Sequence, residues 1–194
     1  MAMDANDEKI QPHERTEAIA ERLAFKSRFV LVFGEIDHAA ARTACTRLIA
    51  LAEESDAPIN VLISSPGGHV ESGDAIHDVI RFVRSPVTTI GTGWVASAGT
   101  HIFIAAPKER RVCLPNTRFM IHQPGGGAGG PATDIAIQAK EILRTKDRIN
   151  QILSSHTQQP LERIVSDSDR DFIMDAEQAK AYGIVDHVIS RREK

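Results

Sequence analysis

Short apolar runs that alternate with helix-forming stretches constrain the fold of this chain most strongly. Residues 29–33 form a continuous apolar run of strand length, and further strands are expected at 59–63 and 87–90. Between them, over about 38–55 and 70–84, the sequence favours helices. Alternation of this kind is typical of right-handed βαβ units, in which helices cover a parallel sheet. Continuous apolar strands also suggest burial on both faces. The sequence therefore predicts an α/β fold.

The second half of the sequence predicts one long helix and several short elements. Isoleucine and leucine recur at helical spacing from 132 to about 156, directly after the glycine-rich stretch Gln123–Gly130. Asp175 and Gln178 form a predicted capping box, and Gly183 closes the short helix that follows. The other expected elements are a helix over 97–105 and strands over 112–114, 119–121 and 184–189.

Composition argues against several classes of partner. A chain of 194 residues fits one domain with a single core. The net charge of −3, without a basic cluster, makes nucleic acid an unexpected partner. Residues 1–15 lack the basic start and apolar run of a secretion signal, and no apolar run reaches the roughly 18 residues of a membrane span. We expect a cytoplasmic protein with an N-terminal arm, 1–24, and one folded domain, 25–194.

The two cysteines, Cys45 and Cys113, each lie inside an apolar stretch. Neither has a neighbour at the cysteine or histidine spacing that zinc sites use. We therefore expect two free thiols, no disulfide framework and no metal site.

Three separate segments carry side chains suited to nucleophilic catalysis. Ser97 follows a strand and two glycines at the expected start of a helix, where backbone N–H groups can face a developing oxyanion. His122 ends an apolar strand, a good position for a general base. Asp171 could orient that histidine, but so could its neighbours Asp167 and Asp169. A helix cap, a core histidine and a solvated charge cluster are the ordinary alternatives, and the residues alone leave them open.

Two glycine-containing segments were considered as binding elements. The turn Ser65–Gly68 follows the second strand, and Gly68 offers a backbone N–H that a substrate carbonyl can approach; an ordinary turn is the alternative. The segment Pro124–Pro131 lacks both the Lys-Ser/Thr of a phosphate-binding loop and the spacing of a dinucleotide site. We therefore expect no bound nucleotide.

Taken in order, these segments resemble the proteolytic subunit of the ATP-dependent Clp protease from about residue 28 to the C-terminus. Each motif alone is weak, but their order and spacing together are highly specific. The motifs are Gly34–Asp37, Ser65–Gly68, Ala96–Gly99, Leu114–Asn116, Met120–Pro124, Ala132–Ile135, Lys140–Leu143 and Asp169–Asp171.

The resemblance implies a role for each candidate residue. By position in the family motifs, Ser97 is the nucleophile of a serine endopeptidase, His122 the general base and Asp171 the third triad member. The backbone N–H groups of Gly68 and Ala98 would form the oxyanion hole. The implied fold is a crotonase-type spiral of βαβ units, in which about 123–156 form a protruding handle.

The resemblance also implies an assembly. Family members form heptameric rings that stack into a tetradecamer, and a hexameric Clp ATPase feeds unfolded polypeptides into the chamber. These are cleaved to short peptides, a task of protein quality control. ATP and Mg²⁺ are used by the ATPase, so the resemblance implies no cofactor in this chain.

Three features depart from the family pattern. Residues 1–21 differ from the usual N-terminal segment, and Asn60 and Leu62 replace aromatic residues of the usual ATPase-docking pocket, where Phe82 and Leu114 remain apolar. Ala98 stands where the family usually has methionine. The first two departures bear on the usual ATPase partnership, and one alternative is a non-degradative scaffold or regulatory ring subunit. The other is an acyl-CoA hydratase or isomerase of crotonase type, whose chemistry on the same fold also uses two backbone N–H groups.

Overall fold

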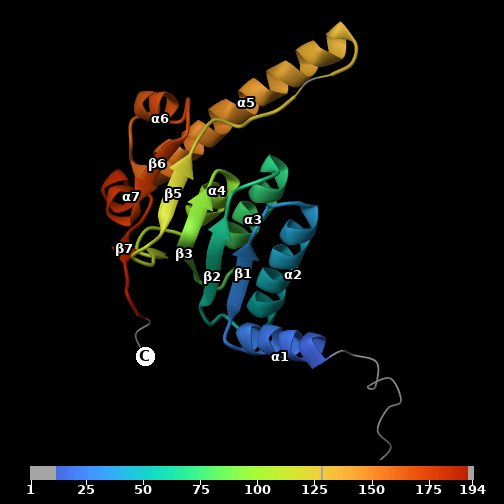
Figure 1. Cartoon of the computed structure of the whole chain (residues 1–194), viewed down its shortest axis with the longest axis vertical. Coiled ribbons are helices and arrows are strands. Elements are labelled where there is room, and N and C mark those ends of the chain that lie inside the picture. Colours follow the sequence, from blue (N-terminus) through green and yellow to red (C-terminus); the bar gives the residue numbers. More distant parts are fainter. Residues whose placement is uncertain (1–11, 128, 192–194) are drawn as a thin grey trace, which may run out of the picture.

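One sheet with helices packed against it forms the body of the protein, and a long helix projects from it (Figure 1). The computed structural model describes residues 12–127 and 129–191. The strands are β1 (Phe29–Phe33), β2 (Ile59–Ser65), β3 (Val87–Ala96), β4 (Arg111–Cys113), β5 (Arg118–Ile121), β6 (Phe172–Asp175) and β7 (His187–Val188). The helices are α1 (Pro12–Lys26), α2 (His38–Glu54), α3 (Val70–Phe82), α4 (Ala98–Phe103), α5 (Ala132–Thr157), α6 (Leu161–Asp167) and α7 (Ala176–Tyr182).

The sheet branches at β3. Parallel pairing runs in the order β1-β2-β3-β4-β7, which agrees with the predicted βαβ pattern. The first half of β3 pairs with β4 at Thr89–Gly91, and its second half pairs with β5 at Trp94–Ala96. β6 then lies antiparallel beside β5. This change of partner gives the sheet its spiral form and leaves the end of β3 between β2 and β5.

The strand β3 is longer than the sequence predicts. Its expected end was Ile90, because Gly91 and Gly93 resemble a turn, but it continues to Ala96. Gly91 lies inside the strand for a packing reason, since a Cβ there would stand 2.9 Å from the ring of Phe119. Glycine within a strand often marks such a close approach.

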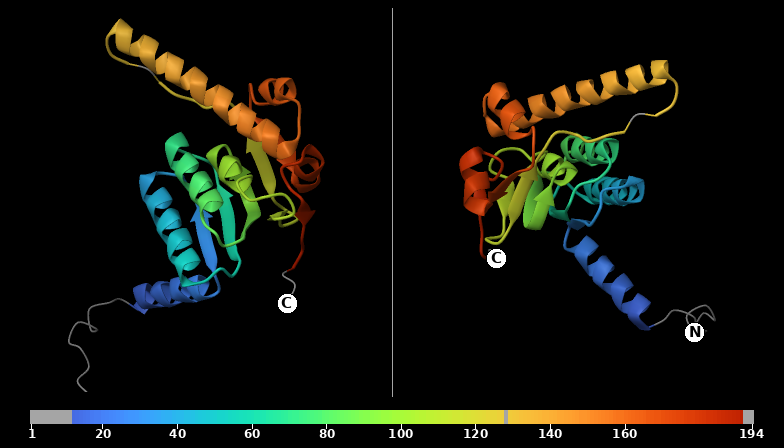
Figure 2. Two further views of the ribbon diagram at one scale, coloured as in Figure 1. Left: turned by 180° about the vertical axis from the view of Figure 1, so that it is seen from behind. Right: turned by 45° about the horizontal axis from the view of Figure 1, so that its top comes forward.

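Helices α2, α3 and α4 cover one face of the sheet (Figure 2). Asp37 caps α2 as predicted, because its side chain accepts a hydrogen bond from the Ala40 N–H at 2.7 Å. Burial of each large apolar side chain stabilises the fold by about 1.5–3 kcal/mol. The largest fully buried side chains include Ile36, Leu48, Ile59, Ile63, Ile76, Phe103 and Phe119.

The prediction that the first strand is buried on both faces is wrong for the single chain. In β1, Val30 and Val32 are buried under the helices, but the side chains of Leu31 and Phe33 are 42% and 54% exposed. The physical reason is that β1 lies at the edge of the sheet and the helices cover only one face. The other face of β1 is thus available to a partner.

The C-terminal region also differs in detail from the prediction. The sequence predicts neither α6 nor β6, and the strand expected over 184–189 shortens to β7. The predicted capping box is present, because Asp175 and Gln178 exchange hydrogen bonds of 2.8 and 2.9 Å. Gly183 ends α7 in the left-handed conformation, with a φ of 94°.

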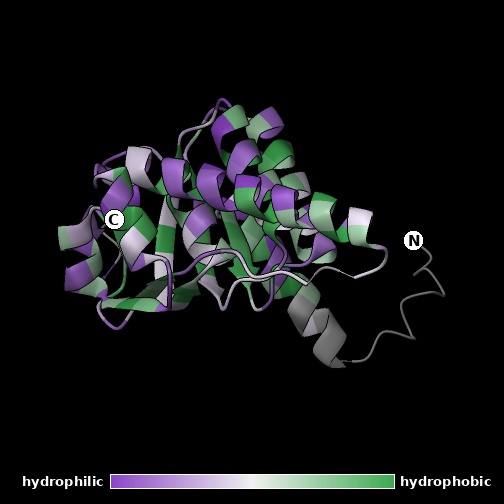
Figure 3. Ribbon diagram, turned by 90° about the horizontal axis from the view of Figure 1, so that it is seen from above, coloured by the Kyte–Doolittle hydropathy of each residue, from purple (hydrophilic) through white to green (hydrophobic). Residues whose placement is uncertain are grey.

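The helix α5 projects from the body as the expected handle, and residues 123–127 and 129–131 lie alongside it (Figures 1 and 2). Described residues of the glycine-rich stretch 123–130 form no regular strand. Hydrophobic and hydrophilic residues are interspersed along α5 (Figure 3). Ile137 and Leu143 are 58% and 61% exposed on the handle, while Leu153 near its base is buried.

The N-terminal arm is only partly described. Residues 1–11 lie outside the described residues, and α1 occupies the rest of the expected arm. Within the described part of the chain, no helix combines the length and apolar character that crossing a membrane requires.

Candidate active site

Ser97 occupies a tight turn between β3 and α4. Its backbone has φ 55° and ψ −120°, a conformation that costs a non-glycine residue about 1–3 kcal/mol. The turn is held in place because the Ser97 N–H donates to the carbonyl of Met120 at 2.9 Å. Gly67 leaves room for it, since a Cβ at Gly67 would stand 2.6 Å from the Ser97 Cβ. Strained strand-to-helix turns of this kind expose nucleophilic serines.

The pairing of β5 with β6 brings the other two predicted residues together. Ile121 is the register partner of Phe172, so His122, which follows β5, lies beside Asp171, which precedes β6. His122 Nδ1 is 3.1 Å from Asp171 Oδ1, and His122 Nε2 is 2.9 Å from Ser97 Oγ. One imidazole thus contacts both the hydroxyl and the carboxylate, the arrangement that serine hydrolases use.

Of the three candidate aspartates, the structure places Asp171 beside the histidine. Asp169 instead accepts hydrogen bonds from the Gln123 side chain, and Asp167 accepts one from the Tyr182 hydroxyl at 2.8 Å. The Asp171 side chain is 66% exposed. In the single chain this pair is therefore weakened by solvent.

Gly68 lies in the turn between β2 and α3, and Ala98 directly follows Ser97. Gly68 has a φ of 151°, and a Cβ there would stand 2.4 Å from the Ile36 carbonyl oxygen. Close packing against Ile36 therefore requires glycine at position 68. This is a second reason for glycine, besides the predicted approach of a substrate carbonyl. Ala98 is the first residue of α4, so its N–H is among the helix-start groups that have no acceptor within the helix.

A small cavity of about 30 Å³ opens beside the serine and histidine. A second, wider groove of about 240 Å³ runs between Gly68–Glu71 and the base of the handle at Pro124 and Gly125. The exposed backbone of the glycine-rich segment thus borders the same region as Ser97. This geometry suits an extended chain lying across the site.

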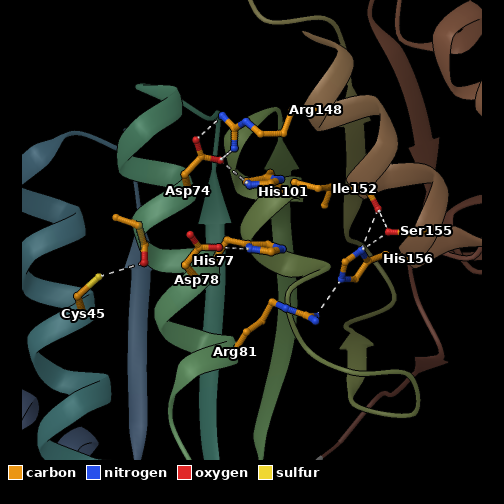
Figure 4. A network of polar contacts seen from close by, with 11 residues as sticks. Cys45, Asp74, His77, Asp78, Arg81, His101, Arg148, Ile152, Ser155 and His156 are labelled. Carbon is orange, nitrogen blue, oxygen red and sulfur yellow. Dashed lines mark hydrogen bonds and ion pairs between the residues drawn. The ribbon is translucent and has the colours of Figure 1, made fainter. Parts of the chain in front are cut away.

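A polar cluster beside the cavity was missed by the sequence analysis (Figure 4). Asp74 of α3 lies 3.0 Å from His101 Nε2 and accepts two hydrogen bonds, at 2.9 and 2.7 Å, from Arg148 of α5. His77 stacks on His101 with 4.5 Å between ring centroids. Helical spacing is the sequence pattern that could have revealed this cluster. His101 lies one turn after Ser97, and His77 lies nearly one turn after Asp74.

Burial and neighbouring charges shift the pKa values in this cluster. Burial alone would raise the pKa of Asp74, but His101 and Arg148 outweigh it and hold that pKa well below its usual range. Burial, reinforced by His101, lowers the pKa of His77 to about 4. His77 is therefore a neutral imidazole near pH 7, and Asp74 is a carboxylate.

Comparison with known proteins decides the family. The Clp protease family model matches residues 11–192, nearly the whole chain. The chain belongs to the Clp protease family. Its membership makes it a serine-type peptidase, and neither the hydratase nor the scaffold alternative is favoured.

Named members of the Clp protease family are similar along most of their length. The ATP-dependent Clp protease proteolytic subunit 3 of Rhizobium meliloti is 55% identical over 86% of this chain and 85% of its own length. Subunit 2 of Gluconobacter oxydans is 56% identical over 85% of this chain and 75% of its own. A solved structure of a ClpP1 mutant from Listeria monocytogenes superposes with a TM-score of 0.83 at 46% identity, covering 90% of this chain and 97% of that one. The Clp-type fold predicted from the sequence is thereby confirmed.

Proposed function

We propose that this Clp-type peptidase cleaves unfolded polypeptides with Ser97 as its nucleophile. The observation that carries the proposal is the position of His122, within hydrogen-bonding distance of both Ser97 and Asp171. Geometry of this kind is the first requirement for a general base.

The chemistry follows from these contacts. His122 Nε2 takes the proton of Ser97 Oγ as this oxygen bonds to the scissile carbonyl carbon. Asp171 accepts from Nδ1–H, which fixes the tautomer and stabilises the imidazolium. The imidazolium then protonates the leaving amine as the C–N bond breaks. Water, deprotonated by the same imidazole, hydrolyses the acyl-enzyme and restores the serine.

Gly68 and Ala98 would stabilise the oxyanion that forms in both steps. The Ala98 N–H lies at the start of α4, and the Gly68 N–H has no hydrogen-bond acceptor among the described residues. Removing one such donor from a hydrolase costs roughly 3–4 kcal/mol of transition-state stabilisation. Because both donors are backbone groups, the replacement of methionine by Ala98 leaves this role intact.

Substrate would bind as an added strand on the glycine-rich segment. Gly125, Gly126 and Gly127 are exposed, so their backbone groups are open to an incoming chain. Pairing through the backbone accepts many sequences, which suits a degradative enzyme. The groove of about 240 Å³ beside Gly125 is the proposed path of the chain.

Assembly into rings and association with a Clp ATPase are the expected context of this activity. The exposed apolar residues Ile137 and Leu143 of the handle are suited to contact between two heptameric rings that form a tetradecamer. A groove of about 610 Å³ that includes Asn60, Leu62 and Leu114 is the proposed docking surface for a hexameric ATPase. ATP and Mg²⁺ would act on that ATPase, and we propose that this chain needs no cofactor of its own. The cytoplasmic location remains a prediction.

Substitution of the serine tests the proposal. We expect Ser97→Ala to abolish hydrolysis of a fluorogenic peptide and of casein while ring assembly, measured by light scattering, stays the same. Hydrolysis by the assembled variant at more than about a thousandth of the wild-type rate would contradict the assignment of the nucleophile. Intact rings without activity in the wild type would favour the scaffold alternative, and CoA binding would favour the hydratase.

A further inference from the structure

The turn between α6 and β6, which leads into Asp171, is fastened by a residue that the proposed mechanism does not use. That residue is Gln123, which directly follows His122 at the end of β5. Its side-chain Nε2 donates to the Asp169 carbonyl oxygen at 2.8 Å and to Asp169 Oδ1 at 3.3 Å. Its backbone N–H donates to the Ser168 carbonyl oxygen at 2.6 Å. One residue thus links the segment of the candidate base to the segment of the candidate aspartate.

Lys146 of the handle helix α5 fixes which way the Gln123 amide points. Its Nζ donates to Gln123 Oε1 at 2.8 Å. An ammonium group donates hydrogen bonds and cannot accept them, so the amide oxygen faces Lys146 and the amide nitrogen faces Asp169. A cation at the oxygen also polarises the amide, which strengthens the hydrogen bonds that its nitrogen donates. The handle is thereby connected to the turn that leads into Asp171.

A second contact from α5 anchors only the start of the same turn. Ser168 Oγ donates to Asn150 Oδ1 at 3.2 Å, and both residues are buried. Beyond Ser168 the chain is exposed from Asp169 to Asp171. The hydrogen bonds from Gln123 therefore tie this exposed part of the turn to the body of the protein.

The Asp171 carboxylate depends on this turn for its position. In the part of the chain that the structure describes, its only hydrogen-bond partner is His122, at 3.1 Å, and 66% of the side chain is exposed. Because an aspartate side chain is short, the path of its backbone decides where its oxygens lie. A displacement of about 1 Å at a catalytic group can cost about 100-fold in rate.

We propose that Gln123 is a positioning residue of the peptidase, which holds the turn so that the Asp171 carboxylate stays within hydrogen-bonding distance of His122. Lys146 keeps the Gln123 amide in the orientation that this task requires. Gln123 lines neither the cavity beside Ser97 nor the groove proposed for the substrate. Its loss should therefore slow the chemical step and leave substrate binding unchanged. This inference rests on the proposed function.

Gln123→Met tests the inference, because methionine keeps the length and the zero charge of the side chain but removes the hydrogen bonds of the amide. Kinetics are measured with an internally quenched peptide on proteins whose assembly is checked by light scattering. We expect kcat to fall at least about tenfold while KM stays within about twofold of the wild type. In an Asp171→Ala background the same substitution should change kcat less than about twofold, because no carboxylate is left to position.

Two results with Gln123→Met would overturn the inference. One is a kcat within about twofold of the wild type. The other is a loss of kcat of the same size in the wild-type and Asp171→Ala backgrounds, because damage that does not act through Asp171 is independent of that residue.

Lys146 supplies a second variant, which decides the matter if Gln123→Met does not assemble. We expect Lys146→Met to lower kcat about fivefold, the equivalent of one hydrogen bond, and Lys146→Arg to recover most of this loss because it keeps a cationic donor. Arg144→Met is the matched control. It also removes one cation from α5, but the Arg144 side chain is 70% exposed and pairs with Glu141 at 2.9 Å. Its kcat should match the wild type, and equal losses in Lys146→Met and Arg144→Met would overturn the inference.

Failure of the proposed function would look different. A wild type that cleaves no peptide, or an Asp171→Ala variant as active as the wild type, would refute the proposed function on which the inference rests. A wild type that cleaves the peptide through Ser97, combined with an unaffected Gln123→Met, would refute the inference alone.

Discussion

At the scale of single residues, the geometry of the nucleophile depends on a glycine that follows the neighbouring strand β2. Gly67 has a φ of 101°, and its hydrogen atom faces the Ser97 side chain where a Cβ would stand 3.1 Å from the Ser97 Oγ. The Ser97 turn is itself strained, so the chain has little freedom to move away. Catalysis here is sensitive to displacements well below the size of a methyl group.

We predict that Gly67→Ala lowers kcat/KM for peptide hydrolysis by at least about 100-fold, because the new Cβ displaces Ser97 from His122. Gly34→Ala is the matched control: its φ of 78° carries the same kind of strain, but no atom lies within 4 Å of the added Cβ. That variant should lose about 1 kcal/mol of stability and retain wild-type kcat/KM. Equal activity losses in both assembled variants would show that backbone strain, and not the contact with Ser97, is responsible.

At the scale of secondary-structure elements, the base of the handle is joined to the body by buried histidines. His77 of α3 faces His101 of α4 and His156 of α5, with ring centroids 4.5 and 5.8 Å apart. Asp78 lies 3.2 Å from His77 Nδ1, and Arg148 reaches the same region from α5. A proton on His77 would therefore add a charge to a crowded, poorly solvated interface.

We predict that this interface weakens as the pH falls. The pKa of His77 is lowered to about 4, below the ordinary histidine value of 6.5, so the unfolded chain binds the proton more tightly than the folded one. The free energy of unfolding therefore keeps its full value above about pH 6.5. As the pH falls toward 4, protonation of His77 lowers it by up to about 3 kcal/mol. Tm measured from pH 7.5 to 4.5 should fall less steeply in His77→Phe than in the wild type. Parallel Tm curves for the two proteins would contradict this assignment.

Prediction from sequence succeeded where local patterns determine local structure. The buried strand β2, the Asp37 cap and the capping box at Asp175 depend on neighbouring residues, and all are present. It failed at Gly91, where a distant phenyl ring required glycine inside a strand, and at β6, whose pairing with β5 is non-local. The candidate triad was named from motif resemblance, since the three residues meet only through the pairing of β5 with β3 and with β6. The cluster of Asp74, His101 and Arg148 was missed because three different helices bring its members together.

At the scale of the whole molecule, the exposed apolar surfaces are those expected of one subunit of a larger assembly. The handle presents Ile137 and Leu143 to solvent, and β1 presents Leu31 and Phe33. Solvent also reaches Asp171, whose partner His122 has a side chain that is one-third exposed. Covering this region with a second subunit would strengthen the His122–Asp171 contact, because it removes the screening water. We therefore expect assembly to raise activity per subunit.

Arg170 offers a test of this link between assembly and activity. Its side chain is 93% exposed and adjoins Asp171 in sequence, so a contact across the ring interface would act directly on the candidate triad. We predict that Arg170→Ala shifts the assembly toward smaller species and lowers peptide hydrolysis at least about tenfold. Arg170→Lys, which keeps the charge, should lose less of both. Unchanged light scattering and unchanged activity in Arg170→Ala would show that this residue has no role in the interface.

The central claim, that Ser97 is activated by His122, is tested most directly by labelling with a fluorophosphonate probe. The modified residue is mapped by mass spectrometry in the assembled wild type and in His122→Ala. We predict modification at Ser97 in the wild type and its loss in the variant, because the hydroxyl is nucleophilic only beside a general base. An assembled wild type that is not labelled at Ser97, or a His122→Ala variant labelled at the wild-type rate, would contradict the claim.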